Sequence, residues 1–471
     1  MQVSEMTVPQ KPIMILGCTS DAGKSLIVTA ICRLLANRGI SVAPFKAQNM
    51  SNNAAITEDG LEIGRAQYLQ ALAAKAKPSV LMNPILLKPS ADTFSQVIVN
   101  GKVDTEISNM PWMARKKLLW PKVIQSLESL QSQYQQVVIE GAGSPAEINL
   151  REGDIVNMSV ALACQADVYL VSDIDRGGSF AHLLGTWACL AEEEQKLIKG
   201  FVLNKFRGDP KLLGNAMDWL EEKTGIPTVA NLPYHRHQLP EEDSFRLGTT
   251  WQQGAINVAL IYYPYASNMD EFDALIYQDD INLVPIQLNQ DLSVFDAVIL
   301  PGSKNSGKSL HFLQLTGLDK TIKTFAESGK LVLGICGGLQ ILGDEIKDPL
   351  QLEDGDKRAL GLIGLTTTLA PNKATQQRNI DWLGQSIEAY EIHHGASQLL
   401  NDAVTPFISD NIGWQQGNIY SSYLHGLFDN AVFYNWFMQQ LGAAQNGISW
   451  KAHVDKELDK LALMFEQHGW L

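Results

Sequence analysis

Two short segments of this 471-residue chain carry residue types at spacings that suit chemistry. The first, G-C-T-S-D-A-G-K-S at 17–25, lies between an apolar run at 12–17 and a stretch of helical spacing at 25–39. A glycine-rich turn between a strand and a helix aims backbone N–H groups at an anion, so we predict a phosphate-binding loop. Lys24 would reach the β- and γ-phosphates of ATP, and Ser25 would hold Mg²⁺. The loop residues predicted to bind ATP are Gly17, Gly23, Lys24 and Ser25.

Polar residues follow other apolar runs of the same half. In a parallel sheet the carboxyl ends of the strands line the ligand crevice. Glu140, which ends the run 136–140, is therefore predicted to bind Mg²⁺ or its water, although a carboxylate that only caps the next turn would look the same. Asn204 is predicted to contact the nucleotide base. The turn at 172–179 could bind metal, phosphate or substrate, or simply face solvent, through Asp173, Asp175 and Arg176.

The second segment places a cysteine on a glycine-flanked turn. K-L-V-L-G-I-C-G-G-L-Q at 330–340 has the pattern of a strand, a sharp turn and a helix, with Cys336 at the apex. That position lifts the thiol clear of the sheet and favours the reactive thiolate, so we predict a nucleophile. A buried structural cysteine is the alternative, and it suits Cys18, Cys32, Cys164 and Cys189. The predicted oxyanion hole consists of Gly337, Gly302 and Ser303.

A thiolate nucleophile needs a base, and nine histidines are available, of which three in the same half of the chain are candidates. His425 lies in Y-S-S-Y-L-H-G-L-F-D-N at 420–430, after a short β-like run, and is predicted to be the base. His393 and His394 are rivals, which would otherwise lie at a strand edge near the substrate.

Apolar runs alternate with helical stretches in both halves, which predicts βαβ units and parallel sheets. We predict an α/β fold with an N-terminal P-loop parallel-sheet domain at 1–235, a polar, acidic linker at 236–253, a flavodoxin-like α/β domain at 254–440 and a C-terminal helical segment at 441–471. The runs predicted to be strands are 12–17, 40–45, 136–140, 167–173, 199–205, 256–263, 295–303 and 330–336. The stretches predicted to be helices include 25–39, 62–76 and about 448–467.

The composition restricts the class of partner. The chain carries 51 acidic and 37 basic residues, a formal net charge of −14, which argues against nucleic acid or an anionic membrane as the main partner. No apolar run approaches the roughly 20 residues of a membrane helix, and the first ten residues have no signal-peptide pattern. The five cysteines form no C-x-x-C pair and favour a reducing compartment, so a cytoplasmic location is predicted.

Residues 255–430 resemble the class I, triad-type glutamine amidotransferases, most closely their cobalamin-pathway branch. The matching motifs are G-I-C-G-G-L-Q around Cys336 and Y-L-H-G-L-F around His425. Most triad glutaminases have a glutamate two residues after the histidine, where this chain has Leu427. The resemblance implies a Cys–His glutaminase whose third member is absent or supplied from elsewhere.

The N-terminal half resembles the dethiobiotin-synthetase-like ATPases, which share a phosphate loop with five residues between its glycines. Four blocks within it resemble the cobyric acid synthase family, at 44–54, 62–74, 82–89 and 95–101. This resemblance implies that ATP activates a corrinoid carboxylate as an acyl phosphate and that ammonia from glutamine displaces the phosphate. It implies amidation of the b, d, e and g carboxylates of adenosylcobyrinic acid a,c-diamide.

The resemblance thus predicts ATP and Mg²⁺ as cofactors, and glutamine and a corrinoid a,c-diamide as substrates. An anionic substrate would suit the cations that we expect near strand ends, which are Lys46, Arg65, Lys88 and Arg207. The predicted substrate site comprises Lys46, Gln48, Asn49, Asp173, Asp175 and Arg176. Two alternatives stay open: another amidotransferase of this architecture, such as cobyrinic acid a,c-diamide synthase or a cell-wall precursor amidase, and a non-enzymatic P-loop binding protein.

Overall fold

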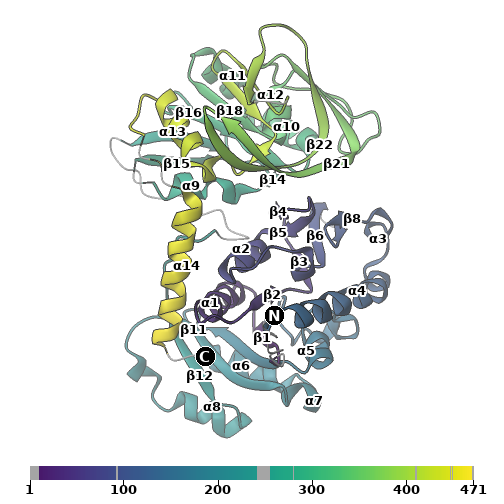
Figure 1. The fold of residues 1–471 in the computed structure, drawn as a ribbon, viewed down its shortest axis with the longest axis vertical. Coiled ribbons are helices and arrows are strands. Elements are labelled where there is room, and N and C mark those ends of the chain that lie inside the picture. The colour runs from purple at the N-terminus through teal and green to yellow at the C-terminus, as the bar shows by residue number, and fades with distance from the viewer. Residues whose placement is uncertain are drawn as a thin grey trace, which may run out of the picture.

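The computed structural model describes residues 10–91, 94–240, 255–278, 280–408, 411–445, 447 and 449–468. Two α/β bodies lie one above the other, and the C-terminal helix α14 (Trp450–Gln467) runs back along the first of them (Figure 1). The linker predicted at 236–253 falls mostly on 241–254, which lie outside the described residues.

The N-terminal body is built on six parallel strands. In spatial order they are β12 (Thr228–Pro233), β11 (Ile198–Phe206), β10 (Asp167–Asp173), β1 (Ile13–Gly17), β9 (Gln136–Glu140) and β2 (Val42–Phe45). Met14, Ile15 and Leu16 of β1 are fully buried, as expected for a parallel strand covered on both faces. Because β1 lies between β9 and β10, the glycine-rich loop that follows it emerges between the ends of those two strands. The strands predicted in this half are confirmed, with end shifts of a residue or two.

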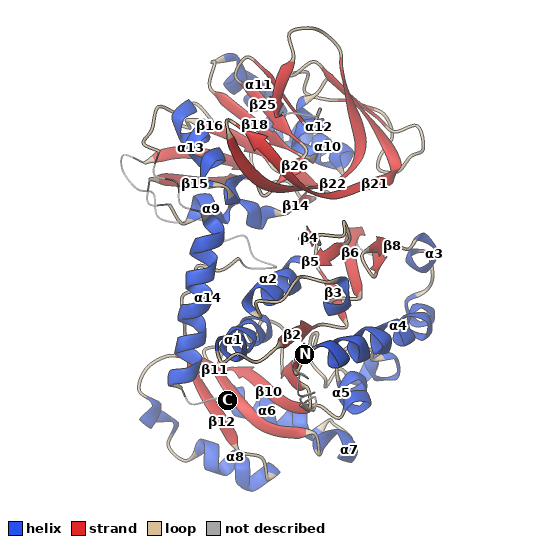
Figure 2. Cartoon of the chain, in the orientation of Figure 1, coloured by secondary structure: helices blue, strands red, loops and turns tan. Residues whose placement is uncertain are grey.

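Helices cover both faces of this sheet (Figure 2). They are α1 (Lys24–Asn37), α2 (Arg65–Ala73), α4 (Trp112–Gln133), α5 (Met158–Cys164), α6 (Ser179–Ala188), α7 (Glu192–Gln195) and α8 (Ala216–Thr224). A small sheet follows β2, with β3 (Gln48–Met50), β6 (Ile85–Ala91), β7 (Phe94–Val99) and β8 (Lys102–Val103), and α3 (Thr105–Ser108) comes after it.

The helix predicted at 62–76 begins later than expected. Glu62–Gly64 form strand β5, which pairs antiparallel with β4 (Ala54–Ile56), and α2 begins only at Arg65. Gly64 has an extended backbone, with φ −58° and ψ 137°, so the turn into the helix is made there. The prediction for 62–64 was wrong because strand pairing with β4 overrides the helix propensity of this stretch.

The C-terminal body has a seven-stranded sheet. Its first five strands are parallel, and each of the last two pairs antiparallel with the strand before it. In spatial order these are β15 (Ile281–Ile286), β13 (Ile256–Ile261), β16 (Ala297–Leu300), β18 (Leu331–Ile335), β25 (Ile419–Ser422), β24 (Gly413–Gln416) and β23 (Thr405–Ile408). Its helices are α9 (Asp273–Ile276), α10 (Ser306–Thr316), α11 (Leu318–Glu327), α12 (Gly337–Leu342) and α13 (Ala431–Gln440). The observed sheets confirm the α/β fold class.

A long antiparallel hairpin faces the N-terminal body. It consists of β21 (Leu365–Trp382) and β22 (Gln385–Leu399), and β26 (Leu424–His425) pairs with β22. The strands β19 (Glu345–Lys347) and β20 (Lys357–Arg358) complete this sheet, and β14 (Ala266–Ser267) pairs separately with β17 (Gly302–Ser303). No strand bounds were predicted within 365–399, where only a strand edge at His393 and His394 was considered.

The helix α14 packs on α1, the helix that follows the glycine-rich loop. Its buried side chains Val454, Leu458, Leu461 and Phe465 are three or four residues apart and so lie on one face. Arg33 of α1 is almost fully buried and pairs with Asp455 at 2.8 Å and Asp459 at 2.7 Å. Among the described residues, no helix has the length and apolar character of a membrane span.

We expect Phe465→Ala to lower the free energy of unfolding by about 3–5 kcal/mol, because Phe465 is 1% exposed and its removal leaves a cavity against α1. Leu463→Ala is the matched control on the same helix: its side chain is 53% exposed, and we expect a change within about 0.5 kcal/mol. Urea unfolding measures both, and equal effects would show that α14 does not dock as described.

Candidate active site

The glycine-rich loop is too tight for side chains at its two glycines. Gly23 has φ +96°, and a Cβ there would lie 2.2 Å from Nδ2 of Asn204. A Cβ on Gly17 would lie 2.8 Å from the carbonyl oxygen of Thr19 and 3.0 Å from Nζ of Lys24. The loop therefore folds closely around the Lys24 amine, which donates a hydrogen bond to the Gly143 carbonyl at 3.2 Å. This is the geometry of a backbone cradle for phosphate, and it fits ATP.

Glu140 is buried at the end of β9, where three donors meet its carboxylate. Ser25 Oγ and Lys46 Nζ each donate to Oε1 at 2.8 Å, and Gln70 Nε2 donates to Oε2 at 2.6 Å. Burial alone would raise the pKa of Glu140, but the Lys46 charge and the hydrogen bonds lower it. Glu140 thus presents an ionised carboxylate beside the Ser25 hydroxyl, and oxygen donors of this kind would fit Mg²⁺ next to nucleotide phosphates.

The predicted base-contacting residue Asn204 lies on the other side of β1. Its Nδ2 donates to the Ala22 carbonyl at 2.8 Å, so in this structure it braces the phosphate loop. Asn204 also borders a cavity of about 160 Å³ next to the loop. The cavity is lined by Gly23, Leu26, Ile27, Asn204, Lys205, Pro233, Tyr234, His235, His237, Met464 and Phe465. A nucleotide base would therefore contact both the N-terminal sheet and α14.

The residues predicted to bind substrate divide into two groups. Lys46 lies at Glu140, with Asn49 nearby in β3 and hydrogen-bonded to Gln67 at 2.9 Å. Gln48 is in the same short strand. On the far side of the loop, Asp173 pairs with Lys205 at 2.9 Å and with Arg176 at 3.5 Å. Asp175 pairs with Arg207 at 3.1 Å, both largely exposed.

Two cations suggested for an anionic substrate lie elsewhere. Lys88 and Glu62 form a buried ion pair, and Glu62 also accepts from Lys373 of the C-terminal body at 2.8 Å. Arg65 pairs with Asp270 of the C-terminal body at 2.6 Å. Arg65 therefore connects the two bodies directly, and Lys88 lies beside Glu62, which connects them. Arg65 follows strand β5, near a strand end as predicted, and a role of either cation in binding substrate stays a prediction.

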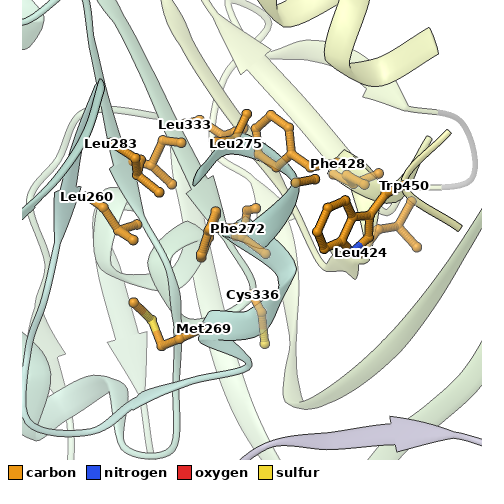
Figure 3. Packing of buried hydrophobic residues seen from close by; sticks show 14 of the residues in the cluster. Leu260, Met269, Phe272, Leu275, Leu283, Leu333, Cys336, Leu424, Phe428 and Trp450 are labelled. Atoms are coloured by element: carbon orange, nitrogen blue, oxygen red, sulfur yellow. The ribbon is translucent and has the colours of Figure 1, made fainter. Parts of the chain in front are cut away.

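Cys336 sits on a strained elbow between β18 and α12. Its φ of +53° and ψ of −106° are unusual for a non-glycine residue. The two positions after it must be glycine because neighbouring backbone leaves no room for a side chain. A Cβ on Gly338 would lie 2.0 Å from the Leu300 carbonyl oxygen, and one on Gly337 would lie 2.6 Å from the Ser303 nitrogen. The thiol is 5% exposed, at the edge of the packed side chains in Figure 3.

The predicted oxyanion residues and the predicted base meet at this elbow. Gly337 and Ser303 are in close contact, and a Cβ on Gly302 would lie 3.0 Å from Cε1 of His425. His425 is 1% exposed at the end of β26. The structure thus brings together five residues from three separate parts of the C-terminal chain, as a cysteine nucleophile and its base would require: Cys336, Gly337, Gly302, Ser303 and His425.

Glu271 supplies the acid that the sequence analysis left unidentified. Its Oε1 lies 2.9 Å from Nδ1 of His425, and its Oε2 accepts from the Gly426 N–H at 3.2 Å. Glu271 belongs to a short 3₁₀ turn, η4 (Met269–Phe272), held against η5 (Leu427–Asp429) by the rings of Phe272 and Phe428, 6.1 Å apart (Figure 3). Leu427, at the usual position of the acid, is fully buried among apolar side chains.

The electrostatics of this pair favour a charged imidazole. Burial lowers the pKa of His425, but the carboxylate of Glu271 and the sulfur of Cys336 outweigh burial and raise the pKa to about 10. A positively charged His425 beside Cys336 stabilises the thiolate. The sequence missed Glu271 because it lies 154 residues before His425, in an acidic stretch with no distinguishing spacing.

The rival histidines are engaged elsewhere. His393 contacts Glu391 at 3.1 Å and stacks on Tyr423. His394 Nδ1 lies 3.1 Å from the Ala370 carbonyl oxygen, and burial and Lys373 lower its pKa to about 4. His393 also has an acid partner, but His425 has both an acid partner and a contact with Cys336, as a base requires.

Two family models match this chain. A CobQ/CobB/MinD/ParA nucleotide-binding domain matches residues 13–244, and a CobB/CobQ-like glutamine amidotransferase domain matches residues 257–433. A cobyric acid synthase of a Polaromonas species is 44% identical, over 97% of this chain and 96% of its own. Those of Polaromonas naphthalenivorans and Deinococcus radiodurans are 48% and 46% identical, over 89% and 90% of this chain and 91% and 92% of theirs.

This chain belongs to the cobyric acid synthase family. The family consists of ATP-dependent glutamine amidotransferase ligases, so the chain is an enzyme with a nucleotide-binding P-loop domain followed by a glutamine amidotransferase domain.

We expect Glu271→Gln to lower the kcat of glutamine hydrolysis by about 10²- to 10⁴-fold, because the amide cannot hold a charged His425 in place. Ammonia-dependent synthesis should be unaffected. Glu391→Gln, which alters the other carboxylate–imidazole pair of this domain, is the matched control and should retain most hydrolysis. Adding Leu427→Glu should not restore Glu271→Gln. A normal rate in Glu271→Gln, or loss in Glu391→Gln alone, would reassign the base.

Proposed function

We propose that this chain amidates carboxylates of a corrinoid a,c-diamide, using ATP and ammonia released from glutamine. The b, d, e and g carboxylates of adenosylcobyrinic acid a,c-diamide are the proposed targets. The observation that carries the proposal is the presence of a phosphate cradle and a Cys–His–Glu group in one chain that matches cobyric acid synthases over nearly its whole length.

At the proposed glutaminase site, His425 holds the proton of the Cys336 thiol. The thiolate attacks the side-chain amide carbon of glutamine, and N–H groups at Gly337 and Ser303 stabilise the oxyanion. His425 gives its proton to the leaving nitrogen, which departs as ammonia. Water then hydrolyses the thioester, releasing glutamate and returning the proton to the site.

At the proposed synthetase site, a substrate carboxylate oxygen attacks the γ-phosphorus of ATP and ADP leaves. Lys24 neutralises charge on the transferred phosphoryl group, and the loop N–H groups hold the phosphates. Mg²⁺, held by Ser25 and Glu140, would supply further neutralisation of that charge. Ammonia attacks the acyl phosphate and inorganic phosphate leaves, which forms the amide.

Ammonia must cross between the two bodies, and their interface supports this. The Cys336 sulfur lies 3.7 Å from the carbonyl oxygen of Ile392. Ile392 is buried in an apolar cluster that joins both bodies and contains Ala54, Ile56, Leu86, Ile98, Tyr390 and Ile392. The thiol is thus placed next to the surface that the synthetase domain covers, where bulk water has little access.

The assignment of functional units follows from the two sites. The proposed synthetase unit is 1–235 and the proposed glutaminase unit is 254–440, with 236–253 as linker and 441–471 as the segment that carries α14. A cytoplasmic location is proposed from the reducing character of the cysteine composition.

Incubation with ATP, Mg²⁺, glutamine and a corrinoid a,c-diamide tests the substrate, with mass spectrometry counting the amides. Because one active site must present several carboxylates in turn, we expect species with three, four and five amides to appear and then decay to six. No mass change with this corrinoid, together with amidation of another carboxylate substrate, would refute the proposal. Direct passage to the six-amide product would instead favour a processive enzyme.

Two variants separate the sites. We expect Cys336→Ala to abolish synthesis from glutamine but to retain synthesis from free ammonia, because the thiolate only releases nitrogen. Lys24→Ala should abolish synthesis from both nitrogen sources, since it acts on ATP before ammonia enters. Rates of phosphate release and amide formation measure both, and loss of ammonia-dependent synthesis in folded Cys336→Ala would contradict the two-site mechanism.

A further inference from the structure

The proposed glutaminase pair His425–Glu271 lies beside a group of acidic side chains at the domain interface. Asp270 and Glu271 are adjacent in η4, and Asp429 ends η5. Asp270 is 3% exposed and Glu271 is 2% exposed, so their charges need a buried cation. Burial, with Asp270 and Glu271 adding to it, raises the pKa of Asp429 to about 7, against the opposing charge of Arg65.

The cation that these acids contact comes from the other domain. Arg65 Nε lies 2.6 Å from Asp270 Oδ2, and its terminal nitrogen lies 4.0 Å from Asp429. Tyr390 of β22 and Tyr68 of α2 are the other titratable groups that face the guanidinium. The backbone joins the domains at the same place, since Arg65 N–H bonds the Asn53 carbonyl and Asn53 accepts from the Asn268 N–H at 3.0 Å.

Arg65 is the first residue of α2, and the same helix reaches the proposed metal site. Gln70 donates to Glu140 at 2.6 Å and lies 3.5 Å from the Ser25 carbonyl oxygen. The five steps along the helix from Arg65 to Gln70 correspond to a rise of about 7.5 Å, so one short, rigid element touches both sites. In Figure 1, α2 lies between α1 and the C-terminal body.

We propose that Arg65 is a positioning residue of the glutaminase, supplied by the synthetase domain, and that α2 couples its position to Glu140 and the nucleotide loop. This inference rests on the proposed function. Arg65 holds Asp270, and so holds η4 with Glu271 in line with His425. Ser25 and Glu140 are the residues that would hold Mg²⁺. A change in the hydrogen bond that Glu140 accepts from Gln70 therefore moves α2, and with it Arg65. Coupling of this kind acts equally in both directions.

The pH dependence of glutamine hydrolysis tests the first half of the proposal in the full-length protein. The charge of Arg65 lowers the pKa of Asp429, so without it the Asp429 carboxylate takes up its proton at higher pH. We therefore expect Arg65→Gln to move the acid limb of the kcat profile upward by about one pH unit, with the rate recovering towards wild type at alkaline pH. Arg65→Lys, which keeps the charge, should lie near wild type.

Arg33→Gln is the matched control, because it removes another buried arginine of the synthetase domain, one whose two carboxylate partners lie on α14. Its pH profile should match wild type. The rate of Cys336 alkylation by iodoacetamide, read on the Cys336 peptide, should follow the same profiles without turnover. An Arg65→Gln profile that overlies wild type, or a rate lowered equally at every pH, would refute a positioning role.

Nucleotide binding tests the second half. We expect a non-hydrolysable ATP analogue with Mg²⁺ to change the Cys336 alkylation rate of wild type about fivefold or more, and Gln70→Ala to lose this response. Reciprocally, alkylation of Cys336 should change the Kd of wild type for the analogue, but not that of Arg65→Gln.

A wild-type Kd that is identical before and after alkylation would refute the coupling, whatever Gln70→Ala does. A change of Kd that persists unaltered in Arg65→Gln would assign the coupling to another element. These assays contain no corrinoid, so failure of corrinoid amidation would reject the proposed function and leave these results standing.

Discussion

Buried charge that has its partner on the other domain is the constraint on which this structure depends. Two cations illustrate it: Arg65 with Asp270, and Lys373 with Glu62. Removing one partner of a buried pair leaves an uncompensated charge, which costs several kcal/mol. The two domains therefore hold each other in a fixed register, and the apolar cluster around Ile392 fills the space between these pairs.

This constraint also explains why both proposed sites lie near the joined surfaces. Cys336 contacts the Ile392 carbonyl, and Glu140 is held by Gln70 of the helix whose first residue reaches the other domain. An enzyme that releases ammonia at one site and uses it at another needs little bulk water between them, because water protonates ammonia and lets it escape. Burial of the interface meets that need through the same contacts that orient the domains.

The sequence was informative where function depends on neighbours in the chain. The glycine-rich loop and the Cys336 elbow are local turns in which neighbouring atoms leave no room for side chains at the glycines. The glycines in the sequence therefore indicate the geometry of these turns. The strands before them are buried runs and were predicted almost to the residue. Long-range contacts were not accessible in this way. Glu271 reaches His425 across 154 residues, and Glu62–Gly64 became a strand because β4 pairs with them. Arg65 and Lys88 were read as substrate cations because nothing local shows that their partners belong to the domain interface.

The place of Glu271 shows how one geometry can arise from a different order of residues. A catalytic histidine needs a carboxylate at Nδ1 to fix its ring and stabilise its charge, but the acid can come from any element that reaches it. At position 427 an acid would be buried among the apolar side chains that now surround Leu427, without a cation at hand. On η4 the acid lies next to Asp270, whose partner is Arg65. The departure at Leu427 thus moves the acid to a face of the histidine site where the neighbouring domain supplies positive charge through Arg65. The orientation of His425 is thereby tied to the assembly of the two domains.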